Sequence, residues 1–317
     1  MSAVRIGFVG VGIIAETHLA VLAGMPQADL VFTVDPRTDR PPPRFRDAAV
    51  PHFAGLAEAV AAHDVDLLVL ATPTPTHADL AVEALTTTGA RVLVEKPLVH
   101  DLDALGRLEG LAPQIDLGRI AVAHHFAFSP EVRWAAGLIA AHPEWGPVTG
   151  ITSAFHDPYL LLGEHAFAAY VSSWMDSGIN QLSMLTRFVD LTDLTSRRED
   201  DQGAAAWCTA AFTDPRHGAP GTARLRTSWH TTASSKESVL VLGETGTEVW
   251  IDHTAMTGFA AQGRAMAAEF GSEDEPPRKI AHYRPLYETL LAGVDDPALT
   301  FATAARVTRL LHARPGP

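Results

Sequence analysis

A lysine at the end of a buried strand is the residue of this chain best placed to do chemistry. Lys96 stands in Glu95-Lys96-Pro97, directly after the apolar run Val92-Leu93-Val94. The carboxyl ends of parallel strands face the place where open α/β sheets bind their ligands. An ammonium group there is costly to desolvate, so it pairs with an opposite charge or works as an acid or base. The position therefore predicts an ion pair or proton transfer.

A glycine turn near the start of the chain predicts a nucleotide site. Residues 4–9 read as a buried parallel strand, and a helix is predicted over 15–23. Gly10 allows a tight turn, and Gly12 lets a pyrophosphate approach the backbone at the helix amino terminus. Ala15 at the third position is a tolerated variant. The predicted cofactor contacts in this turn are Gly10, Gly12, Ile13 and Ile14.

An acidic residue ends the second predicted strand, 30–34. Asp35 lies about 20 residues beyond the turn, where a dinucleotide fold places its ribose-binding carboxylate. Such a carboxylate favours NAD and repels the 2′-phosphate of NADP. Arg37 and Arg40 are close enough to weaken that preference, so NADP stays open beside NAD. Taken alone, the glycine motif could be an ordinary turn and Asp35 an ordinary strand-end cap. Dinucleotide binding is predicted because strand, turn, helix, strand and acidic residue follow one another in the expected order.

Another strand, predicted over 65–70, ends at Thr72-Pro73-Thr74-Pro75-Thr76-His77. A helix over 78–88 follows, so the Pro73 turn lies where a nicotinamide ribose would pass. His77 is either a structural histidine of the first helical turn or a ligand contact.

A short helix is expected over 56–62. The proline- and arginine-rich residues 36–53 predict a surface loop.

These motifs together resemble the glucose–fructose oxidoreductase/inositol dehydrogenase family, also called Gfo/Idh/MocA. The resemblance is carried by Gly10-x-Gly12-x-x-Ala15, Asp35, Thr72-Pro73-x-x-x-His77 and Val94-Glu95-Lys96-Pro97-Leu98. It implies an α/β Rossmann domain with a parallel sheet, followed by an α+β domain with a mostly antiparallel open sheet. It also implies an NAD(P)-dependent enzyme on sugars, cyclitols or polyols, in which Lys96 moves the proton of the reacting hydroxyl or carbonyl. Thr72, Pro73, His77, Glu95, Lys96 and Arg37 join the expected cofactor contacts.

The second half of the chain predicts a different architecture. The domains are expected at 1–121 and 122–317, with the change near residues 120–126. Short turns, such as the hairpin at 243–246, separate the strands and favour an antiparallel sheet. Trp207, Phe212, Trp229 and Trp250 predict either an apolar face for subunit contact, in a dimer or tetramer, or ordinary core aromatics. Helices are expected at 130–141, 165–172, 178–188 and 300–312, and strands at 147–155, 204–213, 221–231, 237–243 and 247–252.

The family pattern Asp-x-Gly-x-His-x-x-Asp falls on residues 176–183. Asp176 and Gly178 match, but Asn180 replaces the histidine and Ser183 the second acid. Positions 176, 180 and 183 share one helical face. Asn180 can orient a substrate hydroxyl, yet it cannot carry a proton near neutral pH. Lys96 then acts alone, with Asp176 holding it and modulating its pKa, or another histidine substitutes.

Four histidines are candidates for that substitution, and each has a structural interpretation beside the catalytic one. They are His124, His125, His156 and His165. His156 follows a strand end in Phe155-His156-Asp157 and has the best claim. We expect no metal site, because no compact ligand spacing occurs and hydride transfer to NAD needs no metal.

Composition and net charge limit the classes of binding partner and the cellular compartment that we expect. The net charge of −13 argues against nucleic acid and against anionic membranes. Cys208 is the only cysteine, which suits a reducing, cytoplasmic compartment. No apolar stretch approaches the roughly 20 residues that span a bilayer. The amino terminus enters a strand at once, so we expect no cleavable signal.

The sequence therefore predicts an NAD(P)-dependent oxidoreductase that interconverts a secondary alcohol and a ketone on a sugar-, cyclitol- or polyol-like small molecule. Two alternatives stay open. One is an enzyme that retains its NAD and uses transient oxidation for elimination, hydrolysis or epimerisation. The other is a catalytically silent nucleotide-binding regulatory protein, which the loss of the motif histidine would suit.

Overall fold

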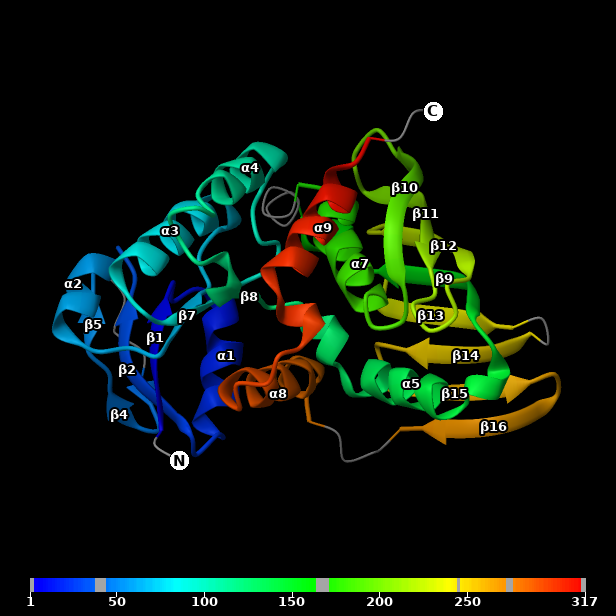
Figure 1. Cartoon of the computed structure of the whole chain (residues 1–317), viewed down its shortest axis with the longest axis horizontal. Coiled ribbons are helices and arrows are strands. Elements are labelled where there is room, and N and C mark those ends of the chain that lie inside the picture. The colour runs from blue at the N-terminus through cyan, green and yellow to red at the C-terminus, as the bar shows by residue number, and fades with distance from the viewer. Residues whose placement is uncertain (1–2, 38–43, 164–170, 244–245, 272–275, 315–317) are drawn as a thin grey trace. The chain divides into compact units, whose positions relative to one another are not determined.

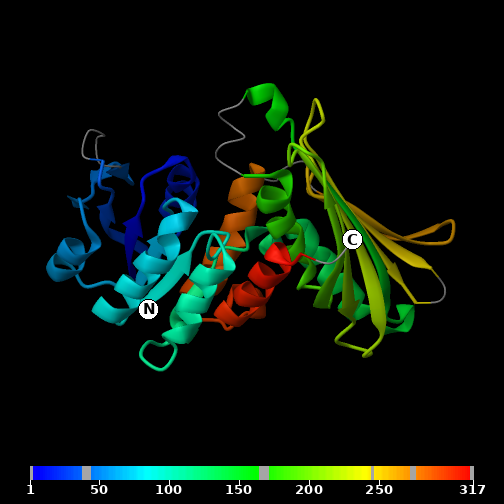
Figure 2. The ribbon, with the colours of Figure 1, turned by 90° about the horizontal axis from the view of Figure 1, so that it is seen from above.

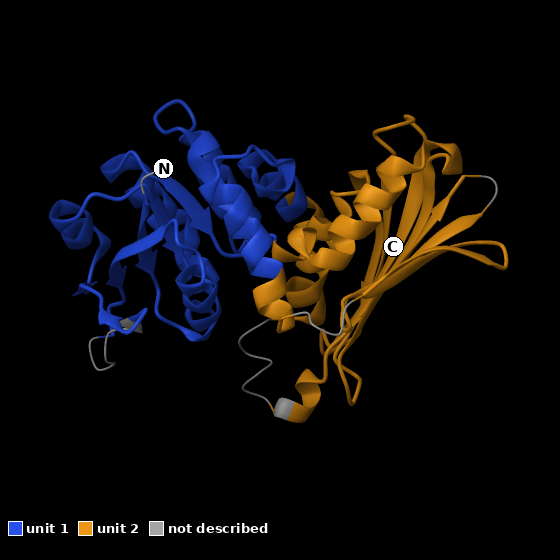
Figure 3. Cartoon of the chain, turned by 90° about the horizontal axis from the view of Figure 1, so that it is seen from below, with its two compact units in different colours: residues 1–124, 282–308 blue, residues 125–281, 309–317 orange. Residues whose placement is uncertain are grey.

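The computed structural model describes residues 3–314 apart from 38–43, 164–170, 244–245 and 272–275. The chain divides into two compact units, which Figure 3 colours separately. The first comprises residues 1–124 and 282–308, and the second 125–281 and 309–317. The first unit thus takes up a late segment, 282–308, that the sequence analysis assigned to the second domain.

The first unit is built on a six-stranded parallel sheet in the order β5-β2-β1-β6-β7-β8 (Figure 1). Its inner strands read as continuous apolar runs because helices cover both faces. Leu67–Leu70 and Val92–Val94 are accordingly buried. Its strands are β1 (Val4–Val9), β2 (Ala28–Val34), β5 (His52–Phe53), β6 (Leu67–Leu70), β7 (Arg91–Val94) and β8 (Ile120–Val122), with β3 (Arg44–Phe45) and β4 (Ala48–Ala49) in a separate pair.

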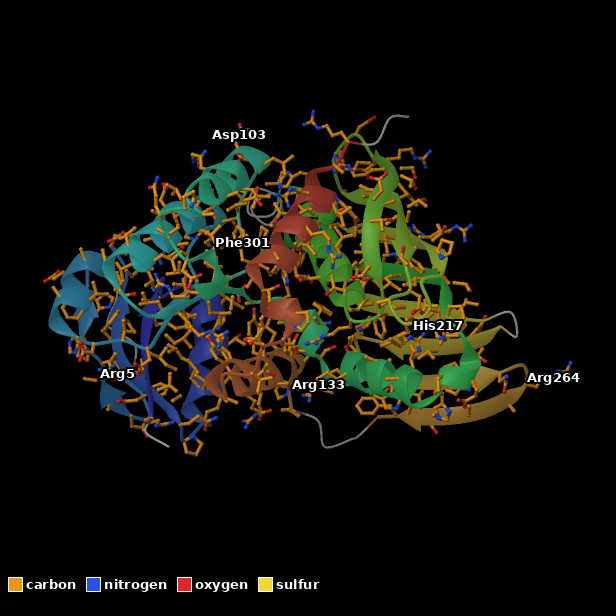
Figure 4. All side chains as sticks on the ribbon, in the orientation of Figure 1. Arg5, Asp103, Arg133, His217, Arg264 and Phe301 are labelled. Atoms are coloured by element: carbon orange, nitrogen blue, oxygen red, sulfur yellow. The ribbon has the colours of Figure 1, made fainter. Side chains whose placement is uncertain are left out.

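Helices and turns of the first unit connect these strands. Residues 282–308 add their apolar side chains to the same core, where Ala304 and Ala305 are buried and Phe301 packs beside them (Figure 4). The elements are α1 (Ile13–Ala23), α2 (Leu56–Ala62), η1 (Thr74–Thr76), α3 (His77–Thr87), α4 (Leu102–Gly110), η2 (Leu117–Arg119), η7 (Pro297–Leu299), most of α8 (Arg278–Leu291) and the start of α9 (Phe301–His312).

The second unit is built on an eight-stranded sheet in the order β10-β11-β12-β9-β13-β14-β15-β16. Every neighbouring pair is antiparallel except β12 with β9. Figure 2 shows its twist. The strands are β9 (Val148–His156), β10 (Asp190–Glu199), β11 (Ala205–Thr213), β12 (Pro220–Ser228), β13 (Ser235–Leu242), β14 (Thr247–Asp252), β15 (Thr257–Gln262) and β16 (Ala265–Phe270).

The helices of the second unit cover one face of this sheet. Gln181 of α7 donates to Ser153 of β9 at 3.0 Å, and Glu131 of α5 lies 2.9 Å from His253, which follows β14. The helical elements are η3 (His125–Phe128), α5 (Pro130–Ala141), η4 (Pro143–Trp145), η5 (Tyr159–Leu162), the π-helix η6 (Trp174–Gly178) and α7 (Ile179–Leu185).

The predicted fold class is confirmed: a parallel Rossmann sheet precedes a mostly antiparallel one. Some elements were not anticipated. Strands β3, β4 and β5 lie within the predicted loop 36–53, and β10, β15, β16, α4 and α8 had no prediction. Of the four aromatics considered for an outer face, Trp207 and Trp250 are partly exposed, whereas Phe212 and Trp229 are buried. Residues 165–170 of the predicted helix 165–172 and the tip of the hairpin at 243–246 lie outside the described residues, and residues 171–172 are not helical.

Candidate active site

The glycine turn between β1 and α1 leaves room for a phosphate. Gly10 has a φ of +92°, and a Cβ there would lie 2.7 Å from the carbonyl oxygen of Ala71, so only glycine fits. A Cβ on Gly12 would meet nothing within 4 Å. Helix α1 begins after Gly12 without a side-chain cap, which leaves its first N–H groups for a ligand. Ile13 is 86% exposed beside them. These features fit the pyrophosphate of a dinucleotide.

Asp35 lies at the end of β2, as expected for a ribose-binding carboxylate. Its Oδ2 accepts from the backbone N–H of Val11 at 2.9 Å, which ties it to the glycine turn. The Arg37 side chain donates to both carboxylate oxygens, at 3.0 and 2.9 Å. The Arg37 hydrogen bonds, stronger than the opposing effect of burial, hold the pKa of Asp35 well below its usual range. A nucleotide ribose would meet a carboxylate and a guanidinium together. Arg40 lies outside the described residues.

His77 is part of the framework of the sheet edge. Its Nδ1 lies 2.9 Å from the carbonyl oxygen of Pro97, and its Nε2 lies 2.9 Å from that of Thr72. The ring is 1% exposed and bridges the segments that follow β6 and β7. The Thr76 hydroxyl donates to the Thr72 hydroxyl at 2.7 Å, which closes the turn through Pro73. His77 therefore holds in place the turn through Pro73, where the sequence analysis expects the nicotinamide ribose.

Glu95, directly before Lys96, is held by a buried network that the sequence analysis missed. Its Oε1 accepts from Tyr283 Oη at 2.7 Å and lies 2.9 Å from His18 Nε2. His18 Nδ1 lies 2.6 Å from Tyr287 Oη. The second oxygen of Glu95 accepts from the Lys96 backbone N–H at 3.1 Å. Burial opposes ionisation of Glu95, but the His18 and Tyr283 hydrogen bonds outweigh it and lower the pKa of the carboxyl.

This network fixes the backbone of Lys96 from three segments of the chain, namely α1, the end of β7 and α8. Lys96 itself is half-buried. Periodicity alone could not find the network, because 269 positions separate His18 from Tyr287. The one local signal was a histidine at a buried position of the nucleotide helix, where an apolar residue is the norm.

His124 is the candidate histidine that belongs to the same sheet edge as Lys96. It follows β8, which pairs with β7, and it interacts electrostatically with Glu95 and Lys96. Its Nδ1 lies 3.1 Å from the carbonyl oxygen of Ala298. The side chain is 2% exposed, and burial lowers the pKa of His124 to about 4. His124 is thus neutral at pH 7.

The motif region of the second unit begins in a π-helix. Asp176 and Gly178 belong to η6, and Asn180 is the second residue of the following α7. The Asn180 amide donates to the Asp176 carbonyl oxygen at 3.2 Å. A Cβ on Gly178 would lie 2.4 Å from the ring of the buried Trp174, which accounts for the motif glycine. Single π-turns within helices occur frequently at functional sites. Asp176 and Asn180 stay close in space, and both are largely buried.

The strand-end pair His156 and Asp157 divides between the two faces of the second sheet. Phe155 pairs with Thr227 and Lys236, whereas His156 pairs with Ser228 and Ser235. The Thr227 hydroxyl contacts Ser173 of the helical layer at 2.9 Å, so Phe155 and Lys236 share the covered face. His156 therefore lies on the opposite face from η6 and α7.

Asp157 instead reaches the helical layer. Its Oδ2 accepts from Ser177 Oγ at 3.3 Å, and its Oδ1 accepts from the buried Lys236 ammonium. The sequence analysis missed both residues of this ion pair. A signal existed for Lys236, because counting back by two from the buried Leu242, Leu240 and Ser238 places it inward.

Two further predictions concern ligands and membranes. No three His, Cys, Asp or Glu side chains gather into a possible metal site among the described residues. Within the same part of the chain, no helix is long and apolar enough to cross a membrane. Of the remaining histidines, His125 begins η3 of the second unit, and His165 lies outside the described residues.

The parallel sheet, the glycine turn and Asp35 define a dinucleotide-binding Rossmann fold. Residues 4–117 match the family model GFO_IDH_MocA, described as "Oxidoreductase family, NAD-binding Rossmann fold". Through these residues the first unit is similar to the Gfo/Idh/MocA family, which confirms for this part of the chain the resemblance inferred from the motifs, and the matching model describes an NAD-binding fold.

Known proteins extend this comparison. An inositol 2-dehydrogenase of Mycolicibacterium smegmatis is 30% identical over 199 residues, which are 61% of this chain and 52% of the relative. The chain thus spans about half the length, or less, of the curated relatives it matches.

Two solved structures share the fold over almost the whole chain. UDP-N-acetylglucosamine 3-dehydrogenase from Acidithiobacillus ferrooxidans is similar with a TM-score of 0.74 and 18% identity, over 98% of this chain and 96% of that one. Scyllo-inositol dehydrogenase from Lactobacillus casei, solved with NAD(H) and scyllo-inositol, has a TM-score of 0.73 and 17% identity, over 99% and 96%.

Proposed function

We propose that the protein is an NAD-dependent oxidoreductase that interconverts a secondary alcohol and a ketone on an uncharged sugar-, cyclitol- or polyol-like substrate. The observation that carries the proposal is Lys96, an amine at the carboxyl edge of a sheet whose glycine turn and Asp35 fit a dinucleotide. The inositol dehydrogenases among the relatives support the substrate class. The pairing of Asp35 with Arg37 keeps NADP as a second cofactor to test.

The residues take separate roles in this proposal. NAD, when bound, supplies the carbon that accepts hydride. Gly10, Gly12 and the start of α1 bind its phosphates, and Asp35 binds a ribose hydroxyl. Lys96 takes the proton of the reacting hydroxyl in oxidation and returns it in reduction. The Glu95 network keeps Lys96 in place, while Asp176 and Asn180 hydrogen-bond other substrate hydroxyls.

The test replaces Lys96 by methionine. We expect Lys96→Met to lower kcat by about 10²–10⁴-fold while NAD still binds, because a positioned acid–base group typically contributes that much. Turnover is followed at 340 nm with a panel of inositols and sugars, and NAD binding by calorimetry. Lys279→Met, which removes an exposed lysine near the start of α8, is the matched control. A Lys96→Met enzyme with near wild-type kcat would show that the assignment is wrong.

The same measurement separates the alternatives. Lasting NADH formation supports the dehydrogenase, and product without NADH supports an enzyme that retains its cofactor. A wild-type protein that binds NAD but transforms no substrate favours the regulatory alternative, which Asn180 in place of the motif histidine motivates.

We also propose that the protein forms a homo-oligomer through the open face of the second sheet. The proposed compartment is the cytoplasm. Arg198, Trp207 and Arg226 line a groove of about 580 Å³ on β10–β12, with both guanidiniums over the indole ring. Toward the other edge, Trp250 stacks on Phe259, and Glu248 holds the indole N–H at 2.9 Å. Arg198 and Arg226 toward one edge of this face and Glu248 toward the other are complementary to a second, rotated copy. We expect wild-type protein to be a dimer or tetramer by light scattering and Trp250→Glu to dissociate it; a monomeric wild type contradicts this.

A further inference from the structure

Lys236 is an unusual residue for its position. The chain has only three lysines, Lys96, Lys236 and Lys279, among 24 basic residues, and all the others are arginines. Lys279 is exposed, Lys96 is the proposed proton carrier, and Lys236 is only 4% exposed within a β-strand. A buried ammonium is costly unless charged partners surround it. Unlike an arginine, a lysine is a compact donor that can also lose its proton.

The surroundings of Lys236 place it beside the motif residues of the second unit. Its ammonium donates to Asp157, which also accepts from Ser234 Oγ at 3.1 Å and from Ser177 Oγ at 3.3 Å. Ser177 is the neighbour of Asp176 in the π-helix η6. Lys236 also interacts electrostatically with Asp176 and Arg278. Strand β13, the end of β9 and the π-helix therefore bring their polar side chains together in one cluster.

The charges that act on Lys236 from the residues that the structure describes balance its own charge and one another. Asp157 and Asp176 carry two negative charges, and Lys236 and Arg278 carry two positive charges. Such a cluster offers acceptors and donors without a net field, which suits adjacent hydroxyls of an uncharged molecule better than an anion. Burial lowers the pKa of Lys236, and the Asp157 carboxylate opposes that shift. An ammonium group has three N–H donors, and the bond to Asp157 uses one.

We propose that Lys236 is a substrate-binding residue of the second unit, whose ammonium donates a hydrogen bond to a hydroxyl oxygen of an uncharged polyol. Asp157 positions it, and Asp176 accepts from the same or the adjacent hydroxyl. Lys236 thereby supplies the charged donor that Asn180 cannot supply. The inference rests on the proposed function for its substrate class and makes no use of Lys96.

The experiment compares Lys236→Met with Lys279→Met. A hydrogen bond to a charged donor contributes about 1.5–3 kcal/mol, so we expect KM for myo-inositol or the best uncharged sugar to rise about 10–100-fold in Lys236→Met. kcat should change less than threefold, and calorimetric NAD binding should not change. Lys279→Met should leave KM unaltered. An unchanged KM in a folded Lys236→Met protein overturns the proposal, and so does a wild type that prefers glucuronate to the uncharged sugars.

Two additions keep the test decisive. Lys236→Met leaves Asp157 buried without its cation, so the double variant Lys236→Met/Asp157→Asn removes both charges and serves where the single variant does not fold. If wild-type protein turns over no substrate, the proposed function fails, and calorimetric binding of myo-inositol to wild-type and variant protein then decides the role of Lys236. Equal affinities, or no binding of any uncharged probe by the wild type, overturn it.

Discussion

Each unit contains a buried carboxylate beside a lysine, and the two carboxylates are stabilised by different partners. Glu95 in the first unit adjoins Lys96, and Asp157 in the second unit holds Lys236. Glu95 is held by an imidazole, a phenol and a backbone N–H. Asp157 is held by an ammonium and two serine hydroxyls. The first carboxylate fixes the backbone of Lys96, the proposed proton carrier, whereas the second pairs directly with Lys236, the proposed substrate-binding residue.

Because of this difference, we expect Asp157→Asn and Glu95→Gln to lower the free energy of unfolding by different amounts. Asp157→Asn should lower the free energy of unfolding by about 3–5 kcal/mol, because it leaves the Lys236 ammonium buried and unpaired. Glu95→Gln should cost less, about 1–3 kcal/mol, because an amide oxygen can still accept from Tyr283. Urea unfolding followed by circular dichroism measures both.

The double variant Lys236→Met/Asp157→Asn is the control for this prediction. Removing both charges should recover most of the loss caused by Asp157→Asn alone. A larger cost for Glu95→Gln than for Asp157→Asn would break the comparison and show that the hydrogen-bonded network, not the ion pair, is the more demanding of the two.

His124 in the first unit and Asp214 in the second should lose their stabilising contributions in different pH windows. Burial lowers the pKa of His124 from 6.5 to about 4, so its neutral form stabilises the fold fully above pH 6.5. That contribution, about 3 kcal/mol, is lost as the pH falls through 6.5 toward 4, because the unfolded chain then binds the proton more readily. Thermal unfolding of His124→Gln between pH 7 and 4 should show a flatter decline than wild type.

Asp214 in the second unit acts at lower pH. Burial opposes its ionisation, but hydrogen bonds from the Arg216 side chain and the Val148 backbone outweigh it and lower the pKa of Asp214 to about 2. Its contribution of about 2 kcal/mol is present above pH 3.8 and is lost as the pH falls toward 2. Asp214→Asn should flatten only this window. His217 also lies near Asp214, at 3.5 Å, so His217→Gln is the control. A single shared acid transition would contradict the comparison.

Much of the first unit could be predicted from the sequence because its candidate functional residues follow strand ends. Gly10, Asp35, Thr72 and Lys96 each stand just after a short apolar run. In a parallel sheet all carboxyl ends meet at one edge, so finding the strands is enough to bring these residues together. The family model, which matches residues 4–117, covers this same part.

The positions of the candidate residues in the second unit could not be predicted from neighbouring residues alone. The sequence singled out His156 as the substitute for the motif histidine, yet the register of β9 places it on the face opposite η6 and α7. The next residue, Asp157, reaches the helical layer. One position along a strand decides between the two faces of a sheet, and only the packing of a helix on one face tells which is which.

The sequence by itself determined the dinucleotide fold, the lysine at its edge and the departure at Asn180, since each is written in neighbouring residues. The tertiary structure decided what surrounds them: His18 and Tyr283 around Glu95, and Lys236 against Asp157. The reason is physical. Strand ends and turns follow from local backbone preferences, whereas the partner of a buried charge is chosen by whichever distant segments pack together.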